Sequence, residues 1–423
     1  MPNPKLVLAA LLAAALTACA DQGPTRLSHL GHATACSIAA APNGSVLVAY
    51  VDGAEGGAKA AAFVRLAKNG TTFDSPQLLS DPANPYPVRD LQLFTSAQGT
   101  FWAIYFTAAA AGNGELFARN FDGAKWLPAF RVGKPLGKSL GNNAALDGVW
   151  SFSATIDPNG NMHVVWAEDP RPADQVTLTT CAPRTIRHAD LLNVGPLHVN
   201  SLTDTLKDPP MNGYRCLDLA FDSAGTPQVL ALNLDTQNVE LLTPGKAQPL
   251  LATASYDLPP GRPSIGRRWL TAPNARPRFL TLPDGAGGGI HILAALEWTP
   301  AERANLRPAN DMPEIIDMPL APLLAGKNTA TLVCETPNAS ILAGGFWLTR
   351  SANHPALLIA TRSPDELLAF APTPGNPTTW GDRYSLAKSK ILAADALDGP
   401  NKSRRILTII QQADQSWVEL HQY

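Results

Sequence analysis

The sequence contains few charged residues. Asp, Glu, Lys and Arg make up 16% of the 423 residues, whereas about 25% is usual in a soluble domain. The formal net charge is only -2, so charge gives no reason to expect nucleic acid or an anionic membrane surface as a partner. Hydrophobic residues account for 45%, which argues against extended disorder and allows a large buried core.

Signatures of cofactors are absent as well. The sequence has no phosphate-binding loop and no dinucleotide fingerprint. Its five cysteines form no CxxC pair and no cluster with histidine that would suggest zinc. We therefore predict no cofactor and no metal site.

A hydrophobic run stands at the amino terminus. Lys5 precedes an apolar stretch from Leu6 to Leu16, and small residues follow it, as in a secretory signal. As a helix, the 13 residues from Leu6 to Ala18 would extend about 20 Å, too short for a bilayer core of about 30 Å. We therefore predict an export signal that does not itself span a membrane.

The sequence Leu-Thr-Ala-Cys that ends at Cys19 resembles the lipobox of bacterial lipoproteins. The resemblance implies a signal peptide over residues 1–18, acylation of Cys19, and a lipid-anchored segment over 19–30. An ordinary signal peptide with a chance cysteine is the alternative. Ala20 stands where an Asp would favour retention in the inner membrane, so the resemblance implies a cell-envelope protein at the outer membrane if the source is Gram-negative.

Four cysteines remain after such cleavage: Cys36, Cys181, Cys216 and Cys334. An even number in an oxidising compartment permits up to two disulfides. Free buried thiols are the alternative.

Turn-forming residues are abundant and recur with a period. The 38 prolines argue against long helices. Alternating apolar residues flank a glycine-containing turn in five segments, whose register glycines are Gly44, Gly99, Gly160, Gly225 and Gly288, at spacings of 55, 61, 65 and 63 residues. Each segment predicts a β-hairpin. Weaker copies begin at Gly344 and Ile391.

Seven such units predict an all-β fold, a β-propeller of seven blades with about four antiparallel strands each, over residues 31–423. A tandem of β-sandwiches is the alternative. A strand within 19–30 could complete the last blade. The proline-rich range 298–327 predicts a long surface excursion, or a disordered segment.

The segment Ile-Asp-Pro-Asn-Gly-Asn-Met-His-Val-Val-Trp from Ile156 resembles one hairpin repeat of the sialidase-like and Asp-box propellers. The full Asp-box pattern and the arginine-isoleucine-proline motif of sialidases are absent. The resemblance therefore supports the fold more than the activity.

Residues before the first strand and after the second strand of each unit share one rim of a propeller. Ten residues before the register glycines stand Thr34, Arg89, Trp150, Arg215 and Arg278, and eight residues after them stand Asp52, Thr107, Glu168, Asn233 and Leu296. Three arginines from separate blades would form an anion site. Pairing of these arginines with local acids such as Asp90 and Asp218 is the alternative.

Family resemblance adds roles to this rim. It implies that the arginines Arg89, Arg215 and Arg278, with Trp150 and Tyr214 beside them, bind the ligand. It further implies a tyrosine with a nearby Glu as nucleophile, and Asp52 or Glu168 as the acid. Cys181 and Cys216 fall on the same rim of neighbouring units, so we predict a disulfide between them.

Two functions fit these features. The favoured one is a lipid-anchored, non-catalytic propeller that binds a protein or glycan partner at the cell envelope. The alternative is a sialidase-like glycoside hydrolase that acts on an anionic glycan through the arginine-rich funnel. Membrane contact is expected only through the lipid.

Overall fold

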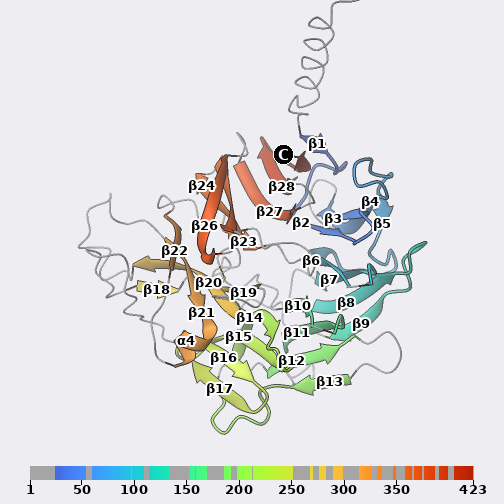
Figure 1. Ribbon diagram of the computed structural model, residues 1–423. Helices are drawn as coiled ribbons and strands as arrows, with labels where there is room; N and C mark the ends of the chain where they lie inside the picture. Colours follow the sequence, from blue (N-terminus) through green and yellow to red (C-terminus); the bar gives the residue numbers. More distant parts are fainter. Residues whose placement is uncertain are drawn as a thin grey trace, which may run out of the picture.

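The computed structural model describes residues 24–422 with internal gaps. The gaps are 54–59, 97, 109–113, 134–151, 158, 169–184, 192–197, 212, 251–266, 270–275, 283–288, 299–313, 326–330, 336–345, 349–357, 364–365, 374–375, 386–389 and 399–403. The described residues form seven antiparallel sheets, which follow one another around a ring (Figure 1). The all-β, seven-bladed prediction is confirmed.

The first four blades are built from consecutive strands. Blade 1 contains β2 (Ala35–Ala40), β3 (Val46–Asp52), β4 (Ala61–Ala67) and β5 (Gln77–Leu78). Blade 2 contains β6 (Val88–Thr95), β7 (Phe101–Ala108), β8 (Gly114–Phe121) and β9 (Phe130–Gly133). Blade 3 contains β10 (Phe152–Ile156), β11 (Met162–Glu168), β12 (Thr185–Asp190) and β13 (His198–Ser201). Blade 4 contains β14 (Tyr214–Phe221), β15 (Pro227–Asn233), β16 (Val239–Thr243) and β17 (Lys246–Pro249).

The last three blades include the irregular elements. Blade 5 contains β18 (Arg267–Trp269), β19 (Arg278–Leu282), β20 (Gly289–Trp298), β21 (Glu314–Pro319) and β22 (Thr331–Glu335), with the short helix α4 (Leu320–Leu324). Blade 6 contains β23 (Phe346–Leu348), β24 (Leu358–Ser363), β25 (Glu366–Thr373) and β26 (Asn376–Ser385). Blade 7 contains β27 (Lys390–Asp398), β28 (Arg404–Gln412), β29 (Gln415–Gln422) and β1 (Thr25–Arg26).

The first hairpins of blades 3 and 4 are fixed by local turn chemistry. In blade 4, Gly225 has a φ of 76°, a conformation that glycine adopts without strain. The Asp222 carboxylate accepts hydrogen bonds from the Ala224 and Thr226 N–H groups at 3.0 and 2.8 Å. Blade 3 repeats this turn with Asp157 and Gly160. These turns set the register that places the same strand positions at the centre of the ring.

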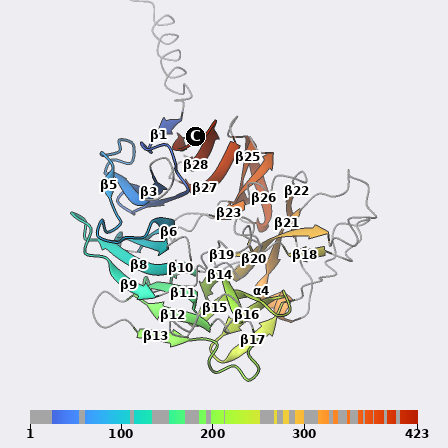
Figure 2. The same ribbon diagram turned by 180° about the vertical axis from the view of Figure 1, so that it is seen from behind.

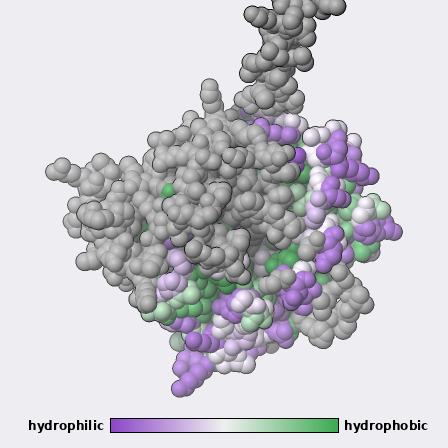
Figure 3. Space-filling model, in the orientation of Figure 1, coloured by the Kyte–Doolittle hydropathy of each residue, from purple (hydrophilic) through white to green (hydrophobic). Residues whose placement is uncertain are grey.

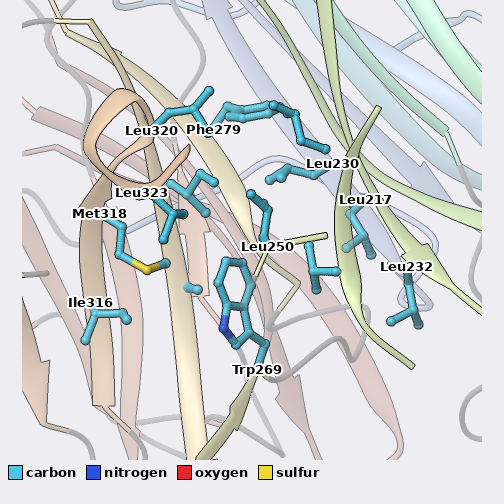
Figure 4. Close-up of a cluster of buried hydrophobic side chains, with 14 of the residues drawn as sticks. Leu217, Leu230, Leu232, Leu250, Trp269, Phe279, Ile316, Met318, Leu320 and Leu323 are labelled. Carbon is cyan, nitrogen blue, oxygen red and sulfur yellow. The ribbon is translucent and has the colours of Figure 1, made fainter. Parts of the chain in front are cut away.

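The core lies between neighbouring blades. Apolar side chains of blade 4 pack against those of blade 5, with Trp269 between them (Figure 4). Equivalent clusters join blades 1 and 2, 2 and 3, 3 and 4, and 7 and 1. Each fully buried Leu or Ile in such a cluster contributes about 1.5–3 kcal/mol. On the face seen in Figure 3, hydrophilic residues cover much of the described outer edge.

Both ends of the described part of the chain lie in blade 7 (Figures 1 and 2). Strand β1 pairs with β29, so that Arg26 lies opposite Glu419. The residues that follow β1 are held by Asp52, whose carboxylate accepts the N–H groups of His29, Leu30 and His32 at 3.1, 2.8 and 2.9 Å. The amino-terminal strand therefore closes the ring.

One local expectation differs from the structure. The range 298–327 contains a strand of blade 5 as well as α4, since β21 buries Ile315, Ile316 and Met318. Among the described residues, no helix is long and apolar enough to cross a membrane.

Candidate functional site

Two arginines stand at the start of the inner strand of blade 5. Arg276 and Arg278 flank Pro277, and a residue before proline is held in an extended conformation. Because side chains alternate along an extended chain, both arginines lie on the same side. Arg276 is 6% exposed, and Arg278 is half-buried.

Neither guanidinium is neutralised by a contact. In the described part of the chain, no carboxylate lies within 4.0 Å of Arg276 or Arg278. The Arg276 Nε is buried and lacks a hydrogen-bond partner there. Burial lowers the pKa of both arginines, and for Arg278 the charge of Arg276 lowers the pKa further. Among the described residues, the pair is therefore a desolvated donor site without a carboxylate contact.

Asp90 on β6 is a carboxylate that acts on both arginines. Its Oδ1 accepts the Leu91 N–H at 2.8 Å. Burial raises the pKa of Asp90, and the charge of Arg276, the Leu91 N–H and the charge of Arg278 oppose this rise. Blades 2 and 5 are separated by at least two blades on either side, so these charges act on one another across the ring axis. We call Asp90, Arg276 and Arg278 the axial site.

A thiol and a second carboxylate adjoin the axial site. Cys36 on β2 is a free thiol, and burial, followed by the charges of Asp395 and Asp90, raises its pKa. Asp395 on β27 accepts hydrogen bonds from Ser37 Oγ and from the Ile38 N–H, both at 2.9 Å. Asp395 therefore joins blade 7 to blade 1.

A similar carboxylate holds the arginine strand in place. Asp218 on β14 is fully buried. It accepts a hydrogen bond from Ser153 Oγ in blade 3 at 2.8 Å and from the Phe279 N–H in blade 5 at 2.7 Å. Since Phe279 follows Arg278 directly, Asp218 fixes the backbone that carries the arginines.

The predicted arginines divide between two environments. Arg278 belongs to the axial site, together with Arg276, which the sequence analysis did not single out. The sequence analysis considered Asp90 only as a local acid that could form an ion pair with the predicted arginines, of which Arg89 is its neighbour. Strand β6 has a bulge between Val88 and Asp90, and Arg89, the extra residue of this bulge, is half-buried.

Arg215 stands next to another residue of the axis. It pairs with Leu232 of β15 and is half-buried. Its neighbour Cys216 is fully buried, and an ionised Cys216 would raise the pKa of both axial arginines. The Cys216 thiol donates a hydrogen bond to the Val165 carbonyl at 4.0 Å.

Three of the predicted residues, Cys19, Trp150 and Cys181, lie outside the described residues. The Cys181 to Cys216 disulfide therefore stays a prediction.

Tyr214 contacts a glutamate of its own blade. The Tyr214 hydroxyl donates a hydrogen bond to Glu240 Oε2 at 2.9 Å, and Asn233 Nδ2 donates one to Glu240 Oε1 at 2.8 Å. Tyr214 is only 2% exposed. Burial and the Glu240 carboxylate raise the pKa of Tyr214.

The two candidate acids make local hydrogen bonds. Asp52 is fully buried and accepts four backbone N–H groups, three from the ring-closing segment and one from Gly53. Glu168 accepts the Trp166 Nε1–H at 2.8 Å and remains half-buried. Asp52 therefore stabilises the backbone of the ring-closing segment, whereas the Glu168 side chain stays partly accessible to solvent.

Three histidines occupy buried polar positions. His163 Nδ1 lies 3.1 Å from His188 Nε2, and His163 Nε2 lies 3.3 Å from Asp157 Oδ2. Burial, then the His163 charge, lowers the pKa of His188 to about 4. His291 Nδ1 lies 2.7 Å from Asp317 Oδ1. Over the described ranges, no three His, Cys, Asp or Glu side chains are placed to hold a metal ion.

Comparison with known proteins supports the fold. The α-L-arabinofuranosidase of Fusarium graminearum, solved with an iminosugar inhibitor, has a TM-score of 0.50 at 8% identity, over 95% of this chain and 98% of that chain. The Trypanosoma rangeli sialidase, solved with sialic acid, has a TM-score of 0.42 at 10% identity, over 95% of this chain and 57% of that chain. A protein of unknown function from Dyadobacter fermentans has a TM-score of 0.46 at 9% identity, over 95% and 98%.

No protein-family model and no curated protein sequence matches the chain. At such low identities the structural likeness shows the propeller fold alone. Any activity must therefore be argued from this chain's own residues.

Proposed function

We propose that this protein is a lipid-anchored, non-catalytic β-propeller of the cell envelope, whose axial site binds an anionic group of a glycan or protein partner. The observation that carries this proposal is the pair Arg276 and Arg278, two desolvated guanidiniums without an ion-pair partner among the described residues. Burial of a guanidinium that has no directly contacting carboxylate is costly. An incoming anion would remove this cost.

The shape of arginine supports the choice of ligand. A guanidinium presents several donors in one plane and matches carboxylate or sulfate oxygens with two hydrogen bonds. Asp218 fixes the strand that carries both arginines, so little conformational entropy is lost when a ligand binds.

The amino terminus supports the cellular location. The lipobox resemblance ends at Cys19, six residues before β1 begins at Thr25. Acyl chains at Cys19 would hold the propeller close to the bilayer. The outer membrane follows if the source is Gram-negative.

A glycoside hydrolase is the second candidate. The contact between Tyr214 and Glu240 favours it, because a tyrosine paired with a glutamate is the nucleophile that the sialidase resemblance implies. The burial of Tyr214 and its raised pKa favour a structural role instead. These two observations make binding the stronger proposal.

Ligand binding can be tested with the purified mature chain on an array of carboxylated, sulfated and neutral glycans. We expect saturable binding to anionic glycans and loss of binding in Arg278→Gln. Arg131→Gln is the matched control, because the Arg131 side chain is 55% exposed and pairs with Glu115 on the surface. No saturable binding, or full binding by Arg278→Gln, would contradict the proposal.

Two further assays address catalysis and location. The hydrolase candidate requires release of sugar from an anionic glycan and loss of that release in Tyr214→Phe. An inactive wild-type protein would exclude this candidate.

The lipid anchor is tested by replacing Cys19. The Cys19→Ala variant should move from the membrane fraction to the soluble fraction. Unchanged fractionation of Cys19→Ala would refute acylation at this residue.

A further inference from the structure

Two exposed leucines lie beside the segment that leads from the amino terminus into blade 1. Leu30 is 41% exposed and Leu78 is 43% exposed. Leu30 follows His29 directly, and the His29 ring lies edge-on to the Phe63 ring, with 4.9 Å between the centroids. Phe63 of β4 is paired with Leu78 of β5, and directly opposite side chains share one face of a sheet. Phe63 packs against the cluster that joins blades 7 and 1, so the two leucines belong to one surface at this junction.

A tryptophan and an arginine continue this surface on blade 7. Trp417 of β29 is half-buried, and the Arg26 guanidinium lies over its ring, 4.3 Å from the centroid. Gly31, which follows Leu30, packs so closely that a Cβ there would lie 3.2 Å from the Trp417 ring. The Arg26 side chain is 44% exposed and lies 3.8 Å from Glu419. We use the name anchor-side surface for Arg26, Leu30, Phe63, Leu78 and Trp417.

The composition of the anchor-side surface matches the boundary between lipid headgroups and acyl chains. Tryptophan is enriched at that depth, because an indole combines a large apolar ring with a polar N–H. An arginine can lay its stem along apolar surface while its charge stays among the headgroups. Exposed leucines gain free energy when they leave water for the boundary layer. The surface therefore has the chemistry of a membrane-contacting face.

The length of chain before β1 indicates what covers this surface. Cys19, the proposed acylation site, stands six residues before Thr25. Six residues extend over at most about 20 Å. Thr25 and Arg26 are themselves fixed to β29 by strand pairing. A bilayer that holds acyl chains at Cys19 is therefore always within about 20 Å of Thr25, the neighbour of Arg26.

We propose that the anchor-side surface rests on the lipid bilayer, with Leu30 and Leu78 inserted among the headgroups and Trp417 at the boundary with the acyl chains. The inference rests on the proposed acylation of Cys19 and adds a second contact to it. The acyl chains supply the attachment, and the surface supplies the orientation.

This orientation has a consequence for the axial site. Strands β1 and β5 are the outermost strands of blades 7 and 1 (Figure 1). A propeller that rests on these strands contacts the bilayer with its outer edge. Both faces of the ring then stay open to the aqueous phase, from which a ligand can reach Arg276 and Arg278.

The test uses the acylated chain in vesicles of phosphatidylcholine mixed with phosphatidylcholine that carries bromine near the headgroup end of its acyl chains. Bromine quenches tryptophan fluorescence at short range. The chain has nine tryptophans, so the share of Trp417 is the quenching that Trp417→Phe loses. Trp126→Phe is the matched control, because Trp126 is also half-buried but lies between β8 and β9 of blade 2. We expect Trp417→Phe to lose most of the bromine-dependent quenching and Trp126→Phe to lose little of it.

A variant with both Leu30→Gln and Leu78→Gln tests the leucines. Both side chains are exposed, so the fold should be kept, and circular dichroism checks this. The variant should stay on the vesicles through Cys19 but lose most of the quenching that Trp417 provides. Val199→Gln is the matched control, since Val199 is 44% exposed on β13 of blade 3, and it should leave the quenching unchanged.

The possible results separate the anchor from the orientation. Equal quenching in Trp417→Phe and Trp126→Phe on vesicle-bound protein would overturn this inference and leave the acylation of Cys19 standing. A protein partner that covers the surface in place of the bilayer would give this result. Unchanged quenching in the leucine variant would also overturn the inference. Mass spectrometry that finds no acyl chain on Cys19 would overturn both.

Discussion

Asp218 and Phe279 are joined across two blades: the Asp218 carboxylate accepts the Phe279 N–H at 2.7 Å. The same carboxylate accepts Ser153 Oγ at 2.8 Å. One buried acid thus connects the inner strands of blades 3, 4 and 5. The arginines of the axial site are positioned by this connection.

Replacement of Asp218 should therefore destabilise the protein. In Asp218→Ala the Phe279 N–H and the Ser153 hydroxyl lose a charged acceptor, which should lower the free energy of unfolding by about 2–4 kcal/mol. Urea unfolding followed by circular dichroism measures this change. Asp204→Ala, on an exposed ion pair with Arg187, should change stability by about 0.5 kcal/mol or less, and equal losses in both variants would refute the argument.

Ring closure should depend on Asp52. Asp52→Ala removes the acceptor for the His29, Leu30 and His32 N–H groups, so the segment that carries β1 should open more often. Hydrogen exchange should accelerate in residues 25–33 and 416–420 and stay unchanged in blade 4. Asp74→Ala is a control because Asp74 is exposed; unchanged exchange in Asp52→Ala would contradict the role of this acid.

Stability should fall in mild acid because of His188. The pKa of His188 is about 4 in the folded protein and about 6.5 in an unfolded chain. The unfolded state therefore binds more protons between these values, and the free energy of unfolding should decrease by up to about 3 kcal/mol as the pH falls from about 6.5 to 4.

Unfolding at a series of pH values compares the wild type with His188→Gln, which should lose this part of the pH dependence. His32→Gln removes a histidine outside the His163 and His188 pair and should keep it. An identical pH dependence in the wild type and in His188→Gln would show that another group is responsible.

The Cys36 thiol should react slowly in the folded protein. Burial and the nearby Asp395 and Asp90 raise its pKa, and the thiolate is the reactive form. We expect alkylation by N-ethylmaleimide at about pH 8.5 to be at least about tenfold slower than in concentrated urea. Mass spectrometry of the peptide that contains Cys36 measures the rate; similar rates in both conditions would contradict the expectation.

The sequence predicted the blades better than the site. Register glycines with positive φ, such as Gly160 and Gly225, mark turns that depend only on neighbouring residues, so local patterns were sufficient to count seven hairpins. The residues at the ring axis depend on how all seven blades close, and no local pattern contains that information.

β-Bulges explain part of why the sequence analysis did not select all residues of the axial site. Counting back from a glycine assumes one residue per step, but β6 and β14 each contain a register shift, between Val88 and Asp90 and between Cys216 and Asp218. In β6 the count therefore selected Arg89, the extra residue of the bulge. The alternation in Arg276, Pro277 and Arg278 was the available signal for the second axial arginine.

The pairing of β1 with β29 has a consequence for how the chain folds. Arg26 must find Glu419, nearly four hundred residues later in the sequence, and the entropy of closing so long a loop has to be offset by contacts made beforehand. Strand β1 therefore stays unpaired until β29 has been synthesised. A chain interrupted anywhere before β29 would leave blade 7 with open edges, ready to pair with another chain, so the ring closes only in a chain that contains β29.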